Sequence, residues 1–562
     1  MKKLFLVAFV FLFSFITNAQ QLLRGPYLQK LTSQSINIKW RTNAASDSKV
    51  YFGTDLNNLN LTATNPAQVT DHEVELENLQ PFTKYYYKIE SNNIVLSGPD
   101  TMHRFKTAPL AGSVQPVRVW AIGDFGKGNQ GEKDTRDSYL QYAGNTHTDV
   151  WLWLGDNAYQ DGTDLEYQQK VFDSTYAFGE VFKFMHFYPC PGNHDYNSVC
   201  RVPCNRHPDN HTGPYYDIVS VPTQAEAGGS ASTREHYYSY DYGNVHFISL
   251  NSELGSPNVN YDWNGVYNPN AHQNSPMMQW LIQDLEQNDK PWVIAYWHQP
   301  PFSKGSHDSD DVWELYMKAM RKNIVPVLEQ YGVDVILNGH SHVFERSYMI
   351  NGYYADNSAD FDPSLHMVDG SSGNETLGEA YIKYTDGDEP NKGTVYVIAG
   401  NSGSSTTDPP FAQTAHPVMY FNDGGSGIFG SFIMDINDNK LVGKYLTSDG
   451  QIKDQFTMIK QSTTGLKGKY NFFEEVKNVQ VSPNPFSNNT VVEFELLRDA
   501  AISIDIFSLD GKTSKNIFSG KQTIGKHQVK LDATMLGLAN GKYILKVTNG
   551  NSTSFEQVIK VN

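Results

Sequence analysis

Hydrophobic and polar positions follow three successive patterns along this chain. From about residue 20 to residue 109 they alternate, as in Ile36, Ile38 and Trp40, which predicts half-buried β-strands separated by turn-rich breaks. From about residue 112 to residue 460, short unbroken apolar runs replace the alternation, as is typical of strands buried on both faces. Alternation then returns in Ile502, Ile504 and Ile506, before the hairpin signal at residues 510–511, and predicts a second all-β unit.

The unbroken apolar runs of the middle part lead directly into polar turns. Four of these runs cover residues 117–122, 150–154, 293–297 and 333–337, and the turns after them contain Asp124, Asp156, His298 and His340. Open α/β sheets place their binding sites at the carboxyl ends of their strands. We therefore expect these four side chains to converge at one edge of the middle domain.

Helical spacing appears between the strands of the middle part. Met278, Leu281, Ile282 and Leu285 recur at that spacing and predict a helix that covers a sheet. Residues 394–399, 430–436 and 440–446 again have the pattern of strands. The predicted fold is an α/β (α+β) sandwich of two mixed β-sheets flanked by helices, with all-β sandwich domains at both ends.

The N-terminal end of the chain has the pattern of an export signal. Lys2 and Lys3 precede an apolar run over residues 4–16, and small residues at 17–19 offer a cleavage site. No later stretch approaches the roughly 20 apolar residues that a membrane helix needs, so no transmembrane segment is predicted. The predicted organisation is a signal peptide at 1–19, a β domain at 20–110, the α/β domain at 111–460, a linker at 461–476 and a C-terminal β domain at 477–562.

Composition excludes some partners and leaves the cysteines open. The chain has 61 acidic and 44 basic residues, a formal net charge of −17, and no Lys/Arg-rich stripe, which disfavours nucleic-acid binding. Cys190, Cys200 and Cys204 allow at most one internal disulfide, and export would permit it. A zinc–thiolate site lacks a convincing fourth ligand, so a loop disulfide or buried thiols are the favoured interpretations.

Five short motifs place Asp, Asn, Tyr or His side chains in or beside tight turns. They are Gly123-Asp124-Phe125-Gly126, Gly155-Asp156-Asn157-Ala158-Tyr159, Gly192-Asn193-His194-Asp195, Tyr296-Trp297-His298 and Gly339-His340-Ser341-His342. Two cations about 3.5–4 Å apart can activate water and neutralise the charge that develops on a phosphate ester. The motifs therefore predict a two-metal hydrolytic centre with seven ligands: Asp124, Asp156, Tyr159, Asn193, His298, His340 and His342.

The order of the five motifs resembles that of purple acid phosphatases within the calcineurin-like metallophosphoesterases. Most relatives in the wider superfamily carry Asp-x-His at the first motif, whereas Gly126 stands at that position here and Tyr159 fills the vacancy. The resemblance implies Fe(III) bound by the phenolate of Tyr159, together with a divalent Zn, Mn or Fe(II) ion. Asp156 would bridge the ions; Asp124, Tyr159 and His342 would complete one, and Asn193, His298 and His340 the other.

Two further resemblances concern the outer domains. The run Leu79-Gln80-Pro81-Phe82-Thr83-Lys84-Tyr85-Tyr86-Tyr87 resembles the tyrosine corner of fibronectin type III-like sandwiches. The segment Ser482-Pro483-Asn484-Pro485-Phe486 resembles the opening of the C-terminal sorting domain of type IX secretion cargo. This second resemblance implies the type IX secretion machinery as a partner and an extracellular or outer-surface location; an accessory adhesive β domain is the alternative.

Three residues outside the metal ligands are candidates for contact with substrate. His194 follows the ligand Asn193, and His307 lies on a Gly-containing loop after His298; both resemble histidines of the family that flank the metals. Either could be the general acid, because histidine titrates near neutral pH and a leaving alkoxide needs a proton. Predicted substrate contacts are Asn193, His194, His307 and Arg346, although Arg346 could instead brace its loop, which we favour.

The leading interpretation is a secreted dinuclear-metal acid phosphatase that hydrolyses small-molecule phosphomonoesters by attack of a metal-bound hydroxide. A second interpretation keeps the metal site and makes the protein a phosphodiesterase or nucleotidase. A third, from another class, is a non-catalytic surface-binding protein whose outer β domains do the work. An inert middle domain would be expected to have lost metal ligands, yet all seven residue types are present in order. The sequence therefore favours an enzyme.

Overall fold

The computed structural model describes residues 20–173, 175, 177–196, 212–253, 275–406, 415–423, 427–462, 476–496, 500–508, 514–548 and 553–562. These residues form two compact units, one up to Gln461 and one from Ser462. The first unit contains the N-terminal β domain and the middle domain. Among the described residues, no helix combines the length and the apolar character needed to cross a bilayer.

Six strands form the N-terminal β domain: β1 Leu22–Gln29, β2 Ile36–Gly53, β3 Leu61–Leu76, β4 Lys84–Ser91, β5 Ile94–Ser97 and β6 Arg104–Lys106. The long strand β2 pairs with β1 through its first half and with β4 through its second half, and β3 lies along its other edge. The hydroxyl of Tyr85 accepts a hydrogen bond from the backbone N–H of Gln80 (2.9 Å). This is the contact that the predicted tyrosine corner requires.

The start of β2 differs from the half-buried strand that alternation predicts. Asn37 and Lys39 are buried, as are their apolar neighbours Ile36 and Ile38. This polar face packs against the middle domain, where the ammonium group of Lys39 donates a hydrogen bond to Ser220 (2.9 Å). These polar side chains are buried because the middle domain covers them, and the sequence pattern of a single strand does not reveal such a contact.

The middle domain contains two seven-stranded mixed sheets. One has the order β10-β11-β12-β13-β18-β14-β19 and the other β17-β22-β21-β20-β7-β8-β9. Their strands are β7 Val117–Ile122, β8 Val150–Leu154, β9 Phe187–Cys190, β10 Tyr238–Tyr242, β11 Val245–Ser249, β12 Trp292–Tyr296, β13 Val335–Asn338, β14 Phe344–Ser347, β17 Tyr381–Tyr384, β18 Val395–Ala399, β19 Met419–Asn422, β20 Gly430–Asn437, β21 Lys440–Thr447 and β22 Ile452–Gln461. A short pair, β15 Met349–Ile350 and β16 Met367–Asp369, lies outside them. The predicted two-sheet sandwich is confirmed.

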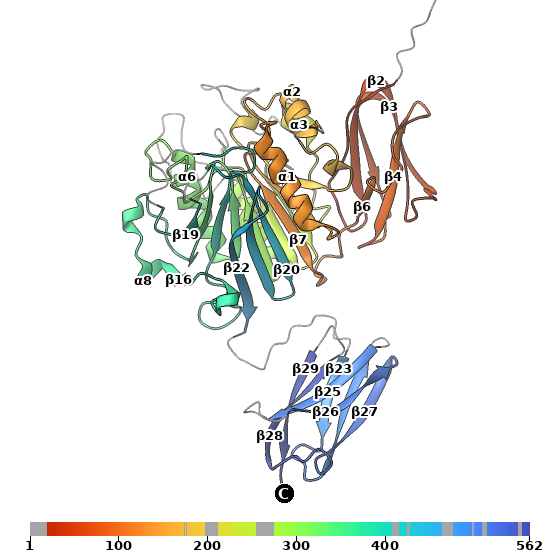
Figure 1. Cartoon of the computed structure of the whole chain (residues 1–562), viewed down its shortest axis with the longest axis vertical. Helices are drawn as coiled ribbons and strands as arrows, with labels where there is room; N and C mark the ends of the chain where they lie inside the picture. The colour runs from red at the N-terminus through yellow and green to blue at the C-terminus, as the bar shows by residue number, and fades with distance from the viewer. Residues whose placement is uncertain are drawn as a thin grey trace, which may run out of the picture. The chain divides into compact units, whose positions relative to one another are not determined.

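Alternate side chains of the buried strands face two different cores, so these strands read as unbroken apolar runs. In β12, Ile294 and Tyr296 belong to a core that includes residues of both sheets, whereas Val293 and Ala295 pack with α5 Pro276–Gln287. The predicted helical spacing falls within α5. On the other sheet, α1 Gln130–Ala143 packs against β20 and β21 and covers part of the sheet (Figure 1).

Five strands of the middle domain end at the five motifs. The strands β7, β8 and β9 are parallel neighbours in one sheet, and β11, β12, β13 and β18 are parallel neighbours in the other. The motifs follow β7, β8, β9, β12 and β13, so all five stand at carboxyl ends of parallel strands. Short helices connect the remaining segments: α2 Asp164–Glu166, α3 Pro214–Ile218, α6 Leu315–Ala319, α7 Val325–Gln330 and α8 Pro363–His366.

The C-terminal unit is an all-β sandwich with its own core. Its sheets are β23-β24-β27 and β26-β25-β28-β29, formed by β23 Val476–Ser482, β24 Asn489–Leu496, β25 Ala500–Ser508, β26 Ser514–Gln522, β27 Gly525–Asp532, β28 Gly541–Thr548 and β29 Thr553–Lys560 (blue in Figure 1). Ile502, Ile504 and Ile506 all point into that core, as their alternation predicts. The predicted hairpin turn at residues 510–511 lies outside the described residues.

Candidate metal centre

Sharp turns at the strand ends bring the motif side chains together. Asp124, Asp156 and His340 have φ values of 56°, 52° and 67°, a left-handed conformation that non-glycine residues seldom adopt and that clusters at functional sites. Gly339 lies so close to the first motif that a Cβ there would stand 2.5 Å from Oδ2 of Asp124. The glycine therefore permits the close approach of two motifs from different sheets.

Asp124, Asp156 and His298 form the centre of the site. One potential ligand atom from each lies within 4.8 Å of the others, and all three side chains are buried. Nε2 of His298 lies 3.3 Å from Oδ1 of Asp156 and 3.2 Å from Oδ1 of Asn193. Nδ1 of His298 lies 2.8 Å from the carbonyl oxygen of Leu154, so this nitrogen donates and Nε2 is the nitrogen that can bind an ion.

Tyr159 and His342 adjoin Asp124 on one side of this centre. The Tyr159 hydroxyl donates to Oδ1 of Asp124 (2.8 Å), and Nε2 of His342 lies 3.4 Å from that hydroxyl and 3.5 Å from the same carboxylate. Burial and the charges of Asp124 and Asp156 raise the pKa of the Tyr159 phenol well above its ordinary value. A phenolate in this position therefore needs a cation beside it.

The structure gives a reason for Gly126 in the first motif. A Cβ at this position would stand 2.0 Å from the carbonyl oxygen of Asn157, and the Gly126 carbonyl accepts the backbone N–H of Tyr159 (2.8 Å). A histidine here would displace the turn that carries Tyr159. The position of Tyr159 at this edge of the site therefore depends on glycine at residue 126.

His340 lies on the other side of the centre, beside His298. The centroids of the two rings are 5.0 Å apart, and the backbone N–H of His340 donates to Oδ2 of Asp124 (2.7 Å). Its Nε2 is buried and has no hydrogen-bond partner among the described residues. Burial and the neighbouring His307 lower the pKa of His340 to about 4, so the ring is neutral and offers a lone pair.

The charge balance of the centre also fits a cation. Burial alone would lower the pKa of His298, but the carboxylates of Asp156 and Asp124 outweigh burial and raise that pKa to about 10. A metal ion placed among these carboxylates would replace the proton as the neutralising charge. The buried carboxylates, the unpartnered Nε2 of His340 and the Tyr159 phenol together fit hard or borderline cations such as Fe and Zn.

His194 and His307 lie at the border of the site and remain partly exposed. The backbone N–H of His194 donates to Oδ1 of Asp156 (2.8 Å), and its ring centroid lies 4.5 Å from that of Tyr159. The ring of His307 packs against that of His340, with 3.8 Å between centroids and 31° between the ring planes. Both predicted proton donors are therefore adjacent to the candidate ligands.

Arg346 does not extend toward the site, and the predicted phosphate contact is corrected to bracing. Its guanidinium group is fully buried and donates to both oxygens of Asp454, to Tyr381 and to the backbone carbonyls of Ser347 and Ser372. These partners use all of its donors. No donor is left for a phosphate.

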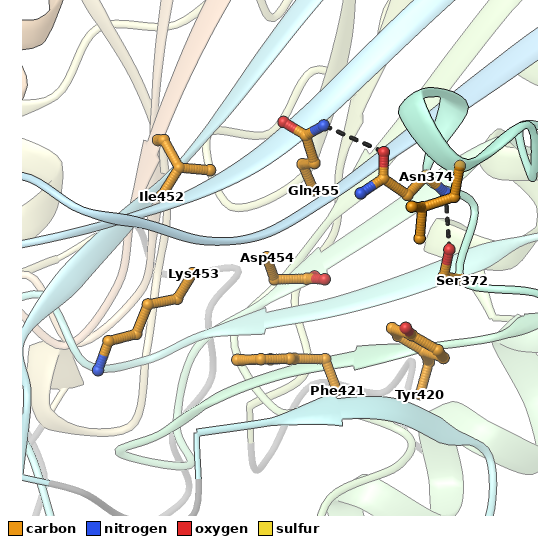
Figure 2. Close-up of a pocket in the computed structure, with 9 residues that line it drawn as sticks. Ser372, Asn374, Tyr420, Phe421, Ile452, Lys453, Asp454 and Gln455 are labelled. Atoms are coloured by element: carbon orange, nitrogen blue, oxygen red, sulfur yellow. Dashed lines mark hydrogen bonds between the residues drawn. The ribbon is translucent and has the colours of Figure 1, made fainter.

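A separate cavity of about 490 Å³ lies beside this buried ion pair. Figure 2 shows Tyr420, Asp454 and Asn374 on its wall, and the Arg346 guanidinium lies 4.6 Å from the Tyr420 ring centroid. None of the seven predicted metal ligands lines this cavity. It is thus distinct from the candidate metal centre.

Two residues beside the site were missed by the sequence interpretation. The buried carboxylate of Asp195 accepts from the backbone N–H and the side-chain amide of Asn157, from the N–H of Gly192 (2.8 Å) and from the Tyr167 hydroxyl (2.6 Å). It joins the second motif to the third, and its place within Gly192-Asn193-His194-Asp195 could have indicated this. Glu314, 2.6 Å from Nδ1 of His307, belongs to no motif.

Of the three cysteines, the structure describes only Cys190. Cys190, at the end of β9, is buried and has no disulfide partner among the described residues, and burial raises the pKa of its thiol well above the ordinary value. Cys200 and Cys204 lie outside the described residues. The choice between a loop disulfide and buried thiols therefore stays open, as in the sequence.

Three family models match separate segments of the chain. Residues 117–344 match the calcineurin-like phosphoesterases, residues 26–107 the purple acid phosphatase N-terminal domain, and residues 480–561 the secretion system C-terminal sorting domain. The chain is 26% identical over 321 residues to purple acid phosphatase 15 of Arabidopsis thaliana, covering 54% of this chain and 53% of that protein. It is 25% identical over 388 residues to acid phosphatase type 7 of Mus musculus, covering 62% and 77%. The chain thus spans about half the length of the first of these relatives.

Solved structures agree on the fold. A purple acid phosphatase from yellow lupin (Lupinus luteus) seeds superposes with a TM-score of 0.57 at 19% identity, covering 78% of this chain and 74% of that one. PhoD superposes with a TM-score of 0.54 at 14% identity, covering 79% and 92%. At these identities the likeness concerns the fold alone.

Proposed function

We propose, from its membership of the purple acid phosphatases within the calcineurin-like phosphoesterases, that this protein is an acid phosphatase that hydrolyses phosphomonoesters at a dinuclear metal centre. The observation that carries the proposal is the convergence of Asp124, Asp156 and His298, whose ligand atoms lie within 4.8 Å of one another. Tyr159, Asn193, His340 and His342 surround them. Side chains from both sheets therefore meet at one point.

Asp156 would bridge the two ions, because it lies between the two groups of candidate ligands. Asp124, Tyr159 and His342 would hold the first ion, for which Fe(III) fits a phenolate ligand, and Asn193, His298 and His340 would hold a divalent Zn, Mn or Fe(II) ion. When bound, the pair of ions activates water as the attacking group and neutralises charge on the phosphate. Binding of the substrate and protonation of the leaving group would fall to side chains of the protein.

Three groups of the chain would bind and protonate the substrate. His194 stands next to Tyr159 and His307 next to His340, so either can contact a phosphate oxygen or the leaving oxygen. The Asn193 amide adds a donor to phosphate. Protonation of the leaving oxygen by histidine would lower the barrier for esters whose leaving groups are poor, typically by about 10²–10⁴-fold in rate.

Lys127 provides further positive charge at the site. Its ammonium group lies 3.3 Å from the centroid of the Tyr159 ring. A net charge of −17 would otherwise repel a phosphate dianion from the protein as a whole. A local cation beside the candidate ligands therefore helps to draw an anionic substrate to this one place.

The C-terminal domain would direct the protein across the outer membrane. The match of residues 480–561 to a secretion sorting domain supports this proposal, as does the boundary between the two compact units at residues 461–462. We therefore propose secretion or surface display by the type IX machinery, preceded by removal of the N-terminal signal peptide. Deletion of residues 477–562 should keep active enzyme inside the cell envelope, and undiminished export would refute the proposal.

Assays with p-nitrophenyl phosphate and its bis ester test the enzymatic proposal. Purified protein should hydrolyse the monoester faster than the diester, and dialysis against a chelator should abolish the activity until metal is restored. Preference for the bis ester would favour the phosphodiesterase interpretation. Full activity after complete removal of metal would contradict the proposal.

A further inference from the structure

The segment between β12 and α6 carries His307 and is held in place on both sides of that residue. Before it, the Ser303 hydroxyl donates to the buried carboxylate of Glu345 (2.5 Å). After it, Asp310 lies 3.1 Å from the Lys304 ammonium and 3.4 Å from the Arg321 guanidinium, which is fully buried. The backbone around His307 is thus fixed by buried charges before any substrate binds.

Glu314, at the end of this segment, contacts both histidines of the border. Its Oε1 lies 2.6 Å from Nδ1 of His307, and its Oε2 lies 3.7 Å from Nε2 of His340. The first distance is that of a charge-assisted hydrogen bond, and the second is too long for a hydrogen bond. Glu314 is therefore engaged with His307, and the lone pair of His340 stays free for an ion.

We propose that Glu314 is a positioning residue that holds His307 as the proton donor to the leaving group. An ionised carboxylate can only accept, so Nδ1 of His307 must carry the hydrogen. The hydrogen bonds of His307 to described residues involve its backbone N–H and Nδ1, so Nε2 is the nitrogen left to face the substrate. The inference rests on the proposed phosphatase activity and names which atom of His307 acts in it.

The step balances without a further reactant. As the phosphorus–oxygen bond breaks, the leaving oxygen takes the hydrogen of Nε2 and departs as an alcohol. His307 is left as the neutral Nδ1–H tautomer, which is the form that Glu314 holds. The product phosphate carries the oxygen supplied by water, and a proton from solvent restores Nε2–H.

Leaving groups of different basicity separate this role from a general loss of structure. p-Nitrophenolate departs without a proton, whereas the alkoxide of glycerol 2-phosphate needs one. Glu314→Ala should lower kcat for glycerol 2-phosphate by about 10–100-fold, a part of the roughly 10²–10⁴-fold that a positioned general acid contributes. The kcat for p-nitrophenyl phosphate, KM for both esters and metal content should change little. Glu314→Gln should recover part of the loss, because an amide oxygen still accepts from Nδ1.

Two further variants complete the experiment. Asp311→Ala removes a carboxylate from the same segment without touching a histidine, and it should resemble the native enzyme on both esters. The double variant Glu314→Ala/His307→Ala should be no slower than His307→Ala alone, because a residue that acts through His307 has no effect once His307 is absent. Additive losses would overturn the inference.

The outcomes separate failure of this inference from failure of the proposed function. A native enzyme inactive on both esters would refute the phosphatase proposal and this inference with it. An active native enzyme with equal losses for the two esters in Glu314→Ala, or with losses matched by Asp311→Ala, would overturn only the inference. Loss of a metal ion from Glu314→Ala, measured by elemental analysis, would make Glu314 a ligand and also overturn it.

Discussion

Replacement of Asp195 tests how the second and third motifs are held together. Its carboxylate accepts hydrogen bonds from four buried donors: the backbone and side-chain amides of Asn157, the backbone of Gly192 and the hydroxyl of Tyr167. In Asp195→Asn an amide N–H replaces one acceptor and faces those donors. Leaving buried donors unpaired costs about 1–3 kcal/mol each, without simple additivity.

The functional effect of Asp195→Asn should exceed its effect on folding. Asp156 and Asn193 stand beside the two residues that Asp195 ties together, so their side chains would lose their mutual alignment. Loss of an outer hydrogen-bond partner of a metal site usually lowers metal affinity or activity by about 10–100-fold. We expect a fall of that size in metal affinity, measured by titration against a metal-buffering chelator, together with a lower unfolding temperature.

Asp284 provides a matched control for this experiment. It is also a fully buried carboxylate with several donors, namely Ser239 (2.7 Å), the N–H of Ser230 (2.7 Å) and His246 (2.8 Å), and it contacts none of the candidate ligands. Asp284→Asn should lower the unfolding temperature comparably and leave metal affinity unchanged. If both variants lose metal equally, the reasoning about Asp195 is refuted.

Three other predictions concern stability and the site. Burial would lower the pKa of His246, but hydrogen bonds to Asp241 and Asp284 outweigh burial and raise that pKa to about 9. Protonated His246 therefore stabilises the folded protein by about 3 kcal/mol. This contribution is complete below about pH 6.5 and is lost as the pH rises toward 9. Thermal unfolding of native and His246→Gln proteins across that range should converge; a constant gap would contradict the assignment. Gly126→Ala should lower stability by about 1–3 kcal/mol and weaken metal retention, because its Cβ would meet backbone at 2.0 Å; chemical unfolding and elemental analysis check both. Arg346→Ala should destabilise the folded protein by about 3–5 kcal/mol, since it leaves a buried carboxylate unpaired, and KM should stay unchanged. A raised KM would show that Arg346 does contact the phosphate.

The architecture could be predicted because each element carries a local signal. Unbroken apolar runs such as residues 150–154 mark strands covered on both faces, and polar turns directly after them mark the site edge. Predicted and observed limits differ by one or two residues, as for residues 293–297 against Trp292–Tyr296. Strand ends depend on hydrogen bonds to neighbouring strands, which the run itself does not encode.

Contacts between distant segments could not be predicted in the same way. The burial of Lys39 depends on Ser220, and the pairing of Arg346 depends on Asp454, so both roles follow from tertiary packing. Glu314 has no motif around it, and only the folded segment places it against His307. Motif residues were found because their turns are local; their supporting partners were not.

The account depends most directly on metal held by Tyr159 and Asp156. Elemental analysis and a visible spectrum of the purified protein should show two metal ions per chain, one of them iron, and a phenolate-to-iron charge-transfer band. Tyr159→Phe should lose that band, whereas Tyr354→Phe, which removes a hydroxyl bonded to Glu329 and to none of the candidate ligands, should keep it. A fully active protein without bound metal, or a band that survives Tyr159→Phe, would contradict the central claim.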